Sequence, residues 1–222
     1  FILMPASALQ QVYQLHISLN NIEPNIWRRI LVPSEITLDI LHITIQKVMG
    51  WEDEHLHLFI DGNKQYGTHE PDWDEFGADH GNESVVQLKQ VLNAPDQTLL
   101  YEYDFGDSWV HTIKLEEIKS EEEVKDSPFC LGGERACPPE NCGSVPGYYH
   151  LLEIMADPKN EEYEDTLLWL GGQFEPDAFY LDEINSISDE PYLDEEEELC
   201  AQVEAQQIVL NLLFKTLKAK HP

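Results

Sequence analysis

Apolar and polar side chains alternate from residue 99 to residue 117, on both sides of a short turn that contains glycine. Residues 99–104 and 109–117 each keep the period of two that is typical of a half-buried strand, and Phe-Gly-Asp-Ser separates them. The residues that share one face of the second segment are Trp109, His111, Ile113 and Leu115. This pattern predicts a β-hairpin, so the fold must contain antiparallel sheet.

The first sixty residues show both the strand period and the helix period. Residues 13–19 and 26–32 are predicted to be paired strands, and residues 55–60 are predicted to be a strand that ends at an Asp61-Gly62 turn. Thr37 is the expected N-cap of a helix that ends at Gly50. The apolar stripe of that helix is Leu38, Leu41, Ile45 and Val48.

The later part of the chain has fewer strand signals. Residues 68–84 are expected to form an irregular acidic loop, and residues 128–147 a loop rich in Cys, Gly and Pro. Short helices are expected at 148–156, 163–170 and 177–184, because Asp-Pro, Gly-Gly and Glu-Pro pairs interrupt the chain around them. Strands first and helices later favour an α+β fold, with a mainly antiparallel sheet of two or more hairpins packed with helices.

We divide the chain into an N-terminal extension (1–12), one α+β domain (13–185), and an acidic linker with a C-terminal amphipathic helix (186–222). That helix is predicted over residues 195–220, where apolar residues recur at alternating spacings of four and three. Acidic residues at its start and lysines near its end complement the helix dipole. Its apolar face is expected to dock on its own domain or on a partner chain.

The charge of the chain restricts its partners. Thirteen Lys and Arg residues against 43 Asp and Glu residues give a formal net charge of −30, which repels phosphate backbones and anionic membranes. Direct nucleic-acid binding is therefore disfavoured, and a protein partner or a small ligand is expected. No apolar run approaches the roughly 18 residues of a membrane span. Without an evident export signal, the four cysteines fit a reducing, cytoplasmic compartment.

Three of the cysteines, Cys130, Cys137 and Cys142, lie within thirteen residues. Thiolates are zinc ligands, but zinc sites usually contain close Cys pairs, and only the second spacing comes near that pattern. Zinc is the expected ion if these residues bind a metal, with a further donor supplied by the fold. The alternative, which the spacing favours, is a group of free thiols without a disulfide.

Two histidines, His55 and His57, lie two residues apart on a predicted strand and so point to the same side. They could bind a metal together with His111, Asp104 or Asp107 from the hairpin. The alternative is that they are structural histidines held by hydrogen bonds.

Polar residues are concentrated in the hairpin turn and in the Gly-Glu-Arg-Ala-Cys loop that begins at residue 133. We predict that one ligand site contains Asp104, Asp107, Trp109, His111 and Arg135, with Glu134 and Arg28 as further candidates. The structural alternative is that the two aspartates cap a tight turn and that each arginine holds a carboxylate.

Several short motifs occur in the order found in a known family. They are Tyr-Gln-Leu at 13–15, Ile-Trp-Arg-Arg at 26–29, Met-Gly-Trp at 49–51, His-Leu-His at 55–57, the hairpin at 101–111, Gly-Glu-Arg-Ala-Cys-Pro-Pro-Glu at 133–140 and Trp-Leu-Gly at 169–171. In these motifs the chain resembles the Ri-plasmid ORF-3-like family. The resemblance implies a single α+β domain with no established reaction, cofactor or catalytic residue. It also implies an association with mobile elements, whose passengers include such proteins.

Two function hypotheses follow. The first is an interaction or small-ligand-binding domain whose site lies where the hairpin meets the Cys-containing loop. The second is a metal-dependent, hydrolase-like enzyme that uses the His, Asp and Cys residues named above. The sequence contains no P-loop, nucleophile elbow, Rossmann fingerprint or His-Glu-x-x-His motif that would name a reaction.

Overall fold

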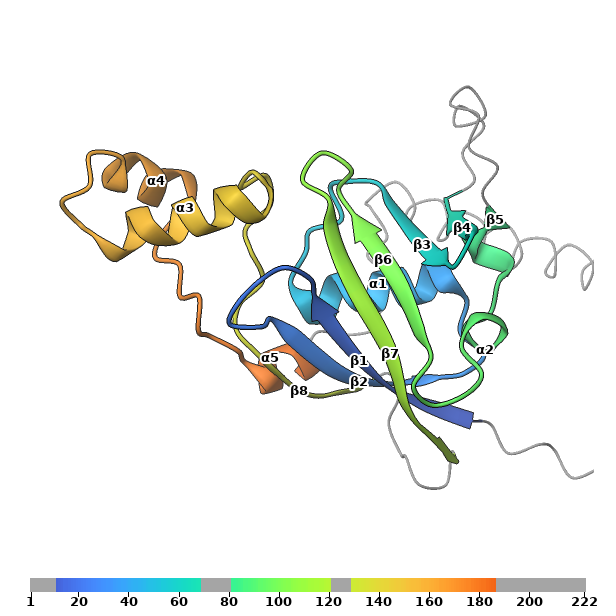
Figure 1. Cartoon of the computed structure of the whole chain (residues 1–222). Helices are drawn as coiled ribbons and strands as arrows, with labels where there is room; N and C mark the ends of the chain where they lie inside the picture. Colours follow the sequence, from blue (N-terminus) through green and yellow to red (C-terminus); the bar gives the residue numbers. More distant parts are fainter. Residues whose placement is uncertain (1–10, 69–80, 121–128, 187–222) are drawn as a thin grey trace, which may run out of the picture. The chain divides into compact units, whose positions relative to one another are not determined.

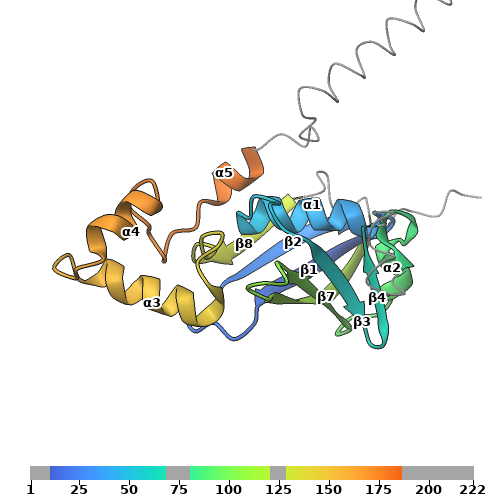
Figure 2. The ribbon, with the colours of Figure 1, turned by 90° about the horizontal axis from the view of Figure 1, so that it is seen from above.

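A computed structural model describes residues 11–68, 81–120 and 129–186 of the chain. The described residues from Gln11 to Asn185 belong to one compact unit, built on an eight-stranded sheet with helix α1 across one face (Figures 1 and 2). The strands are β1 (Gln11–Leu19), β2 (Trp27–Pro33), β3 (His57–Asp61), β4 (Lys64–Gly67), β5 (Gly81–Asn82), β6 (Thr98–Tyr103), β7 (Trp109–Ser120) and β8 (Phe129–Glu134). The helices are α1 (Leu38–Met49), α2 (Leu88–Val91), α3 (Ser144–Ala156), α4 (Tyr163–Trp169) and α5 (Leu181–Ser186).

The strand order is β5-β4-β3-β6-β7-β1-β2-β8, and every neighbouring pair is antiparallel except β4 and β5. The predicted hairpins β1–β2, β3–β4 and β6–β7 are all present. Long central strands, β1 and β7, pair with each other along their whole length. The α+β fold with a mainly antiparallel sheet is therefore confirmed.

The apolar face of the sheet and the apolar stripe of α1 form the core. Trp109, His111, Ile113 and Leu115 on β7 are at most 1% exposed, as their period of two predicts. From α1, Leu38, Leu41, Ile45 and Val48 pack into the same core, each at most 4% exposed. Burying one such side chain contributes about 1.5–3 kcal/mol, so these two faces supply much of the stability of the unit.

Helix α1 ends as the sequence predicts. Gly50 adopts a left-handed conformation (φ 100°) and its N–H donates to Gln46 O, a termination that glycine adopts without the steric penalty of a Cβ atom. Thr37 occupies the N-cap position, although its side chain makes no capping hydrogen bond.

The region expected to be a Cys-rich loop contains an unpredicted strand. Residues 129–134 form β8, which pairs with β2 at one edge of the sheet. Its Gly-Gly pair weakens the sequence signal for a strand, yet glycine is required where β8 crosses Arg28. A Cβ atom on Gly133 would lie 2.6 Å from Trp27 O and 2.8 Å from Arg28 Cδ. Three other differences concern helices: α2 was not predicted, α3 begins at Ser144 rather than at residue 148, and α5 begins at Leu181 rather than at residue 177.

The outer edge of β8 is covered by one side chain from α5. Asn185 Nδ2 donates to Cys130 O, and Asn185 Oδ1 accepts from the Cys130 backbone N–H, both at 2.9 Å. The amide therefore pairs with this residue as a neighbouring strand would.

Helices α3 and α4 lie side by side (Figure 1). Leu168 and Trp169 at the end of α4 are 81% and 51% exposed. Within the described ranges no helix has the length and hydrophobicity needed to cross a membrane. The amphipathic helix predicted over residues 195–220 lies outside the described residues.

A buried arginine joins three segments of this fold. Arg28 on β2 is 2% exposed, and all five of its N–H donors reach backbone carbonyls. The acceptors are Val48 O, Met49 O, Trp27 O, Glu134 O and Arg135 O, at 2.7–3.3 Å. Burial lowers the pKa of Arg28, and the aromatic ring of Phe179 lies 4.8 Å from its guanidinium carbon. The expected carboxylate partner is replaced by main-chain oxygens.

The adjacent arginine behaves as the structural alternative predicts. Arg29 Nε and Nη2 donate to the two oxygens of Glu116 at 2.6 and 2.8 Å, a bidentate pair. The hydrogen bond from Arg29 is the main reason that the pKa of Glu116 falls to about 2.

We predict that Arg28→Met costs about 3–5 kcal/mol of unfolding free energy, because it leaves buried carbonyls without donors. Arg29→Met is the matched control, and it should cost about 1 kcal/mol or less, since its ion pair is partly exposed. Urea unfolding at neutral pH measures both. Equal losses in the two variants would contradict the role given to Arg28.

Candidate functional site

A pocket of about 580 Å³ opens between α1, the start of β3 and the turn that follows β6. Three imidazoles, His42, His55 and His57, line it, and we call it the histidine pocket after them. Five carboxylates and an apolar rim complete the described lining, in which Lys and Arg are absent. The carboxylates are Asp39, Asp53, Glu54, Glu83 and Asp104.

Two of the imidazoles are stacked on each other. The rings of His42 and His57 are parallel to within 4°, with centroids 3.5 Å apart. His57 Nε2 lies 2.8 Å from Glu83 Oε2, and Glu83 Oε1 accepts from the Thr68 hydroxyl at 3.0 Å. Each stacked ring therefore has its own carboxylate partner, because His42 pairs with Asp53.

The partners of His42 form a closed ring of hydrogen bonds. Gln46 Nε2 donates to Tyr101 Oη, so the Tyr101 hydroxyl proton is directed to His42 Nδ1. His42 Nε2–H then donates to Asp53 Oδ1 at 2.8 Å, and the Asp53 backbone N–H returns to Gln46 Oε1 at 2.9 Å. This set of contacts is compatible with a His42 that carries its proton on Nε2. Burial lowers the pKa of His42 and favours its neutral form.

Asp53 remains charged in this ring. Burial alone would raise the pKa of its carboxyl, but the hydrogen bond from His42 opposes that effect, and the net shift is downward. The charge of Asp53 therefore persists at neutral pH while the imidazole beside it is neutral. A neutral His42 leaves the negative charge of Asp53 in the pocket.

The third imidazole lies between two other carboxylates. His55 Nε2 is 3.7 Å from Asp104 Oδ2 and 3.8 Å from Glu140 Oε2, too far for hydrogen bonds. Tyr103 holds Glu140 in place, because its hydroxyl donates to Glu140 Oε1 at 2.8 Å. Burial, followed by this contact with Glu140, raises the pKa of Tyr103.

Asp104 has an unusual backbone conformation at this wall of the pocket. Its φ is +55°, in the left-handed region that few residues other than glycine adopt. Its N–H donates to Leu56 O, and its Oδ1 accepts from the Gly106 N–H at 2.8 Å. The predicted capping role of Asp104 is thus observed, and the same contacts direct the rest of the carboxylate towards His55.

The family model described as plasmid pRiA4b ORF-3-like protein matches residues 11–183. The chain belongs to this family. The match confirms the resemblance found in the sequence, and it covers the strands and helices that build the histidine pocket.

Two relatives of this plasmid ORF-3-like protein carry no assigned activity. The chain is 34% identical over 160 residues to the uncharacterized protein y4hQ of Sinorhizobium fredii, which covers 72% of this chain and 81% of that protein. It is 38% identical to the crystal structure of protein of unknown function MM3350 from Methanosarcina mazei Go1, with a TM-score of 0.69. That likeness covers 79% of this chain and 98% of the other. Fold and family are thus shared, and function must be argued from the site.

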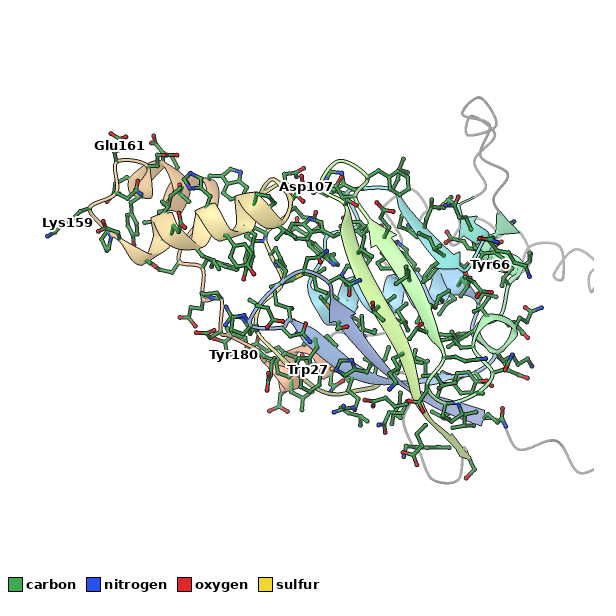
Figure 3. The ribbon with its side chains drawn as sticks, in the orientation of Figure 1. Trp27, Tyr66, Asp107, Lys159, Glu161 and Tyr180 are labelled. Atoms are coloured by element: carbon green, nitrogen blue, oxygen red, sulfur yellow. The ribbon has the colours of Figure 1, made fainter. Side chains whose placement is uncertain are left out.

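The predicted ligand residues lie in four different places. Asp104 lines the histidine pocket, whereas Glu134 and Arg135 line a second pocket of about 410 Å³, where Arg135 pairs with Asp177. Arg28 lies in the core. Asp107 is at the tip of the β6–β7 turn, where its Oδ2 accepts from the Gly143 N–H at 2.9 Å beside the start of α3 (Figure 3).

The two remaining candidates, Trp109 and His111, are core residues. His111 is fully buried, and its Nε2 accepts from Trp51 Nε1 at 3.2 Å. Trp51 also packs against Trp109, with ring centroids 5.7 Å apart. Burial lowers the pKa of His111 to about 4.

The candidate metal ligands take up several different environments. Cys130, Cys137 and Cys142 are free thiols, and burial raises the pKa of each, to about 12 for Cys142. His55 and His57 both line the histidine pocket but have different partners. In the three described ranges no three His, Cys, Asp or Glu side chains are placed to hold a metal ion. The predicted zinc site therefore gains no support there.

Sequence reasoning missed His42, Asp53, Glu83, Tyr101 and Glu140. His42 left one signal: it lies four residues after Leu38 and one after Leu41, next to the apolar stripe of the helix. A polar residue at such a position needs a buried partner. Glu83 and Glu140 gave no signal in the sequence, because they lie on segments far along the chain that only the tertiary fold brings to the site.

We predict that His111 makes stability fall on acidification. The folded state holds this proton less tightly than the unfolded chain, whose histidines have a pKa of about 6.5. The contribution of neutral His111 to the free energy of unfolding is therefore intact above about pH 6.5. It is lost as pH falls towards 4, by up to about 1.4 kcal/mol per pH unit.

The test compares wild type with His111→Gln, which keeps an acceptor for Trp51 but does not titrate. Urea unfolding between pH 7 and pH 4.5 should show a shallower decline for His111→Gln. His150→Gln, at an exposed position, should keep the wild-type slope. An unchanged slope in His111→Gln would rule out this source of acid sensitivity.

Proposed function

We propose that this protein is a small-ligand-binding domain and that the histidine pocket is its binding site. One observation carries the proposal: polar side chains from five separate segments converge on a single cavity of about 580 Å³. That volume lies within the range of about 300–1,000 Å³ that is usual for small-molecule sites. The rim supplies apolar surface through Ile43, Leu56 and Phe105.

The organisation of the walls supports this function. The closed hydrogen-bond ring of Gln46, Tyr101, His42 and Asp53 holds those side chains in one arrangement before any ligand arrives. A preorganised site loses less conformational entropy when it binds. Asp104, at positive φ, adds a strained residue of the kind that is concentrated at ligand sites.

The second pocket is a weaker candidate. It is smaller, at about 410 Å³, and its described lining is limited to six residues. Its cationic group, Arg135, is already paired with Asp177. The net charge of −30 also argues against an extended nucleic-acid ligand on this protein.

We predict that a tryptophan at position 43 blocks ligand binding. Ile43 lies on α1 at the rim, 50% exposed, and an indole there would fill the mouth of the pocket. Ile40→Trp is the matched control, because Ile40 lies on the same helix and is 46% exposed but does not line the pocket. A fragment library is screened by ligand-observed NMR against wild type, and hits are titrated against both variants.

Hits should bind Ile43→Trp at least about tenfold more weakly, a loss of about 1.4 kcal/mol, and should bind Ile40→Trp as they bind wild type. Hits that bind all three proteins equally would place the site elsewhere. A library without any hit on wild type would count against the function itself.

A further inference from the structure

Two buried polar atoms, one on His55 in the wall of the histidine pocket and one on Glu140 beside it, lie 3.8 Å apart as an ion pair but have no hydrogen-bond partner. His55 Nε2 and Glu140 Oε2 are both buried and make no hydrogen bond within the described chain. Asp104 Oδ2 faces the same Nε2 from 3.7 Å, while Oδ1 of that carboxylate is occupied by Gly106 N–H. We call His55, Asp104 and Glu140 the acidic corner.

Unpaired buried polar atoms are costly, at about 1–3 kcal/mol each and more for charged groups. Native structures therefore rarely keep them without a water or a ligand. The side chains of Asp104 and Glu140 are each only 10% exposed, so bulk solvent does little to stabilise their charges. The side chains of the corner therefore leave carboxylate oxygens available to a group that donates hydrogen bonds.

The charge around the corner selects the sign of that group. Asp53 and Glu54 also line the pocket, and the described lining contains no Lys or Arg. Burial lowers the pKa of His42, the imidazole hydrogen-bonded to Asp53, and so favours its neutral form. An anion would meet uncompensated carboxylates, whereas a cation is attracted.

The number of acceptors selects the kind of cation. Asp104 Oδ2 and Glu140 Oε2 are two acceptors, and His55 Nε2 is a third when its proton is on Nδ1. A primary ammonium has three donors and no acceptor, so it matches this set. A metal ion needs ligands at about 2.0–2.2 Å, and no three described side chains are placed to hold one.

The rim indicates what the ammonium is attached to. Ile43, Leu56 and Phe105 are 50%, 49% and 43% exposed and line the same pocket. Such exposed apolar groups beside a charged corner suit an alkyl or arylalkyl skeleton. His55, 27% exposed, can rotate to open the corner, a side-chain change that is common on binding.

We propose that the histidine pocket binds a small primary amine, with its ammonium group at His55, Asp104 and Glu140 and its carbon skeleton against Ile43, Leu56 and Phe105. This inference rests on the proposed ligand-binding function of the same pocket and adds the class of ligand.

The test uses the full chain and a panel of arylalkyl and alkyl amines, such as 2-phenylethylamine and butylamine. Each amine is paired with the alcohol and the carboxylate of similar shape. Isothermal titration calorimetry at neutral pH and low salt should show amine affinities at least about tenfold above those of the alcohols, with the carboxylates weaker still. Raising the salt concentration should weaken amine binding selectively.

Asp104→Asn is the decisive variant. Asparagine tolerates positive φ and can still accept from Gly106 N–H, so the turn should keep its shape while one charge is removed. Amine affinity should fall at least about tenfold, and alcohol affinity should stay the same. Asp107→Asn, which changes the other carboxylate of this turn, is the matched control and should bind amines as wild type does.

Several outcomes would overturn the inference. Alcohols that bind as tightly as amines, or amine binding unchanged in Asp104→Asn, would show that the pocket does not recognise an ammonium group. The pocket would then remain a ligand site of another kind. Zinc or manganese chloride alone, binding in an Asp104-dependent way while the amines do not bind, would assign the corner to a metal. If the panel fails to bind and Ile43→Trp leaves every fragment hit unaffected, the inference and the proposed function fall together.

Discussion

A guanidinium buried without a carboxylate must find five acceptors elsewhere, and in this fold the acceptors are main-chain carbonyls from three segments. Arg28 connects the end of α1, its own strand β2 and the end of β8. The loop that follows α1 carries Asp53 and His55 into the histidine pocket, and the chain after β8 carries Glu140 towards it. The position of the pocket walls therefore depends on one side chain that never reaches the pocket.

The two sides of the cavity differ in how completely their polar side chains are hydrogen-bonded. On one side, every member of the Gln46, Tyr101, His42 and Asp53 ring has its partner, so that wall is complete without a ligand. On the other side, His55 and Glu140 keep buried atoms unpaired. A rigid wall facing an incomplete one is the arrangement expected of a site that is shaped in advance and stabilised on binding.

Local periodicity was enough to predict most of the fold. Strands β1, β2, β6 and β7 and helix α1 all follow from apolar spacing, because each buries one face against the same core. Strand β8 could not be predicted, since the need for glycine at position 133 becomes clear only from the close approach of Trp27 O and Arg28. Of the candidate site residues, Asp104, His55 and His57 do line the pocket, but Glu83 and Glu140 come from distant segments that no spacing rule connects.

The Asn185 amide that covers Cys130 affects how copies of this protein can associate through their sheets. The last strand of an open sheet exposes unpaired main-chain groups, and an extended segment of another molecule can add to them. Here the Asn185 side chain occupies both main-chain groups of Cys130, the second residue of β8, while the opposite border of the sheet is a strand of only two residues. Neither border offers a long template, so growth of the sheet from chain to chain is discouraged even when the protein is concentrated.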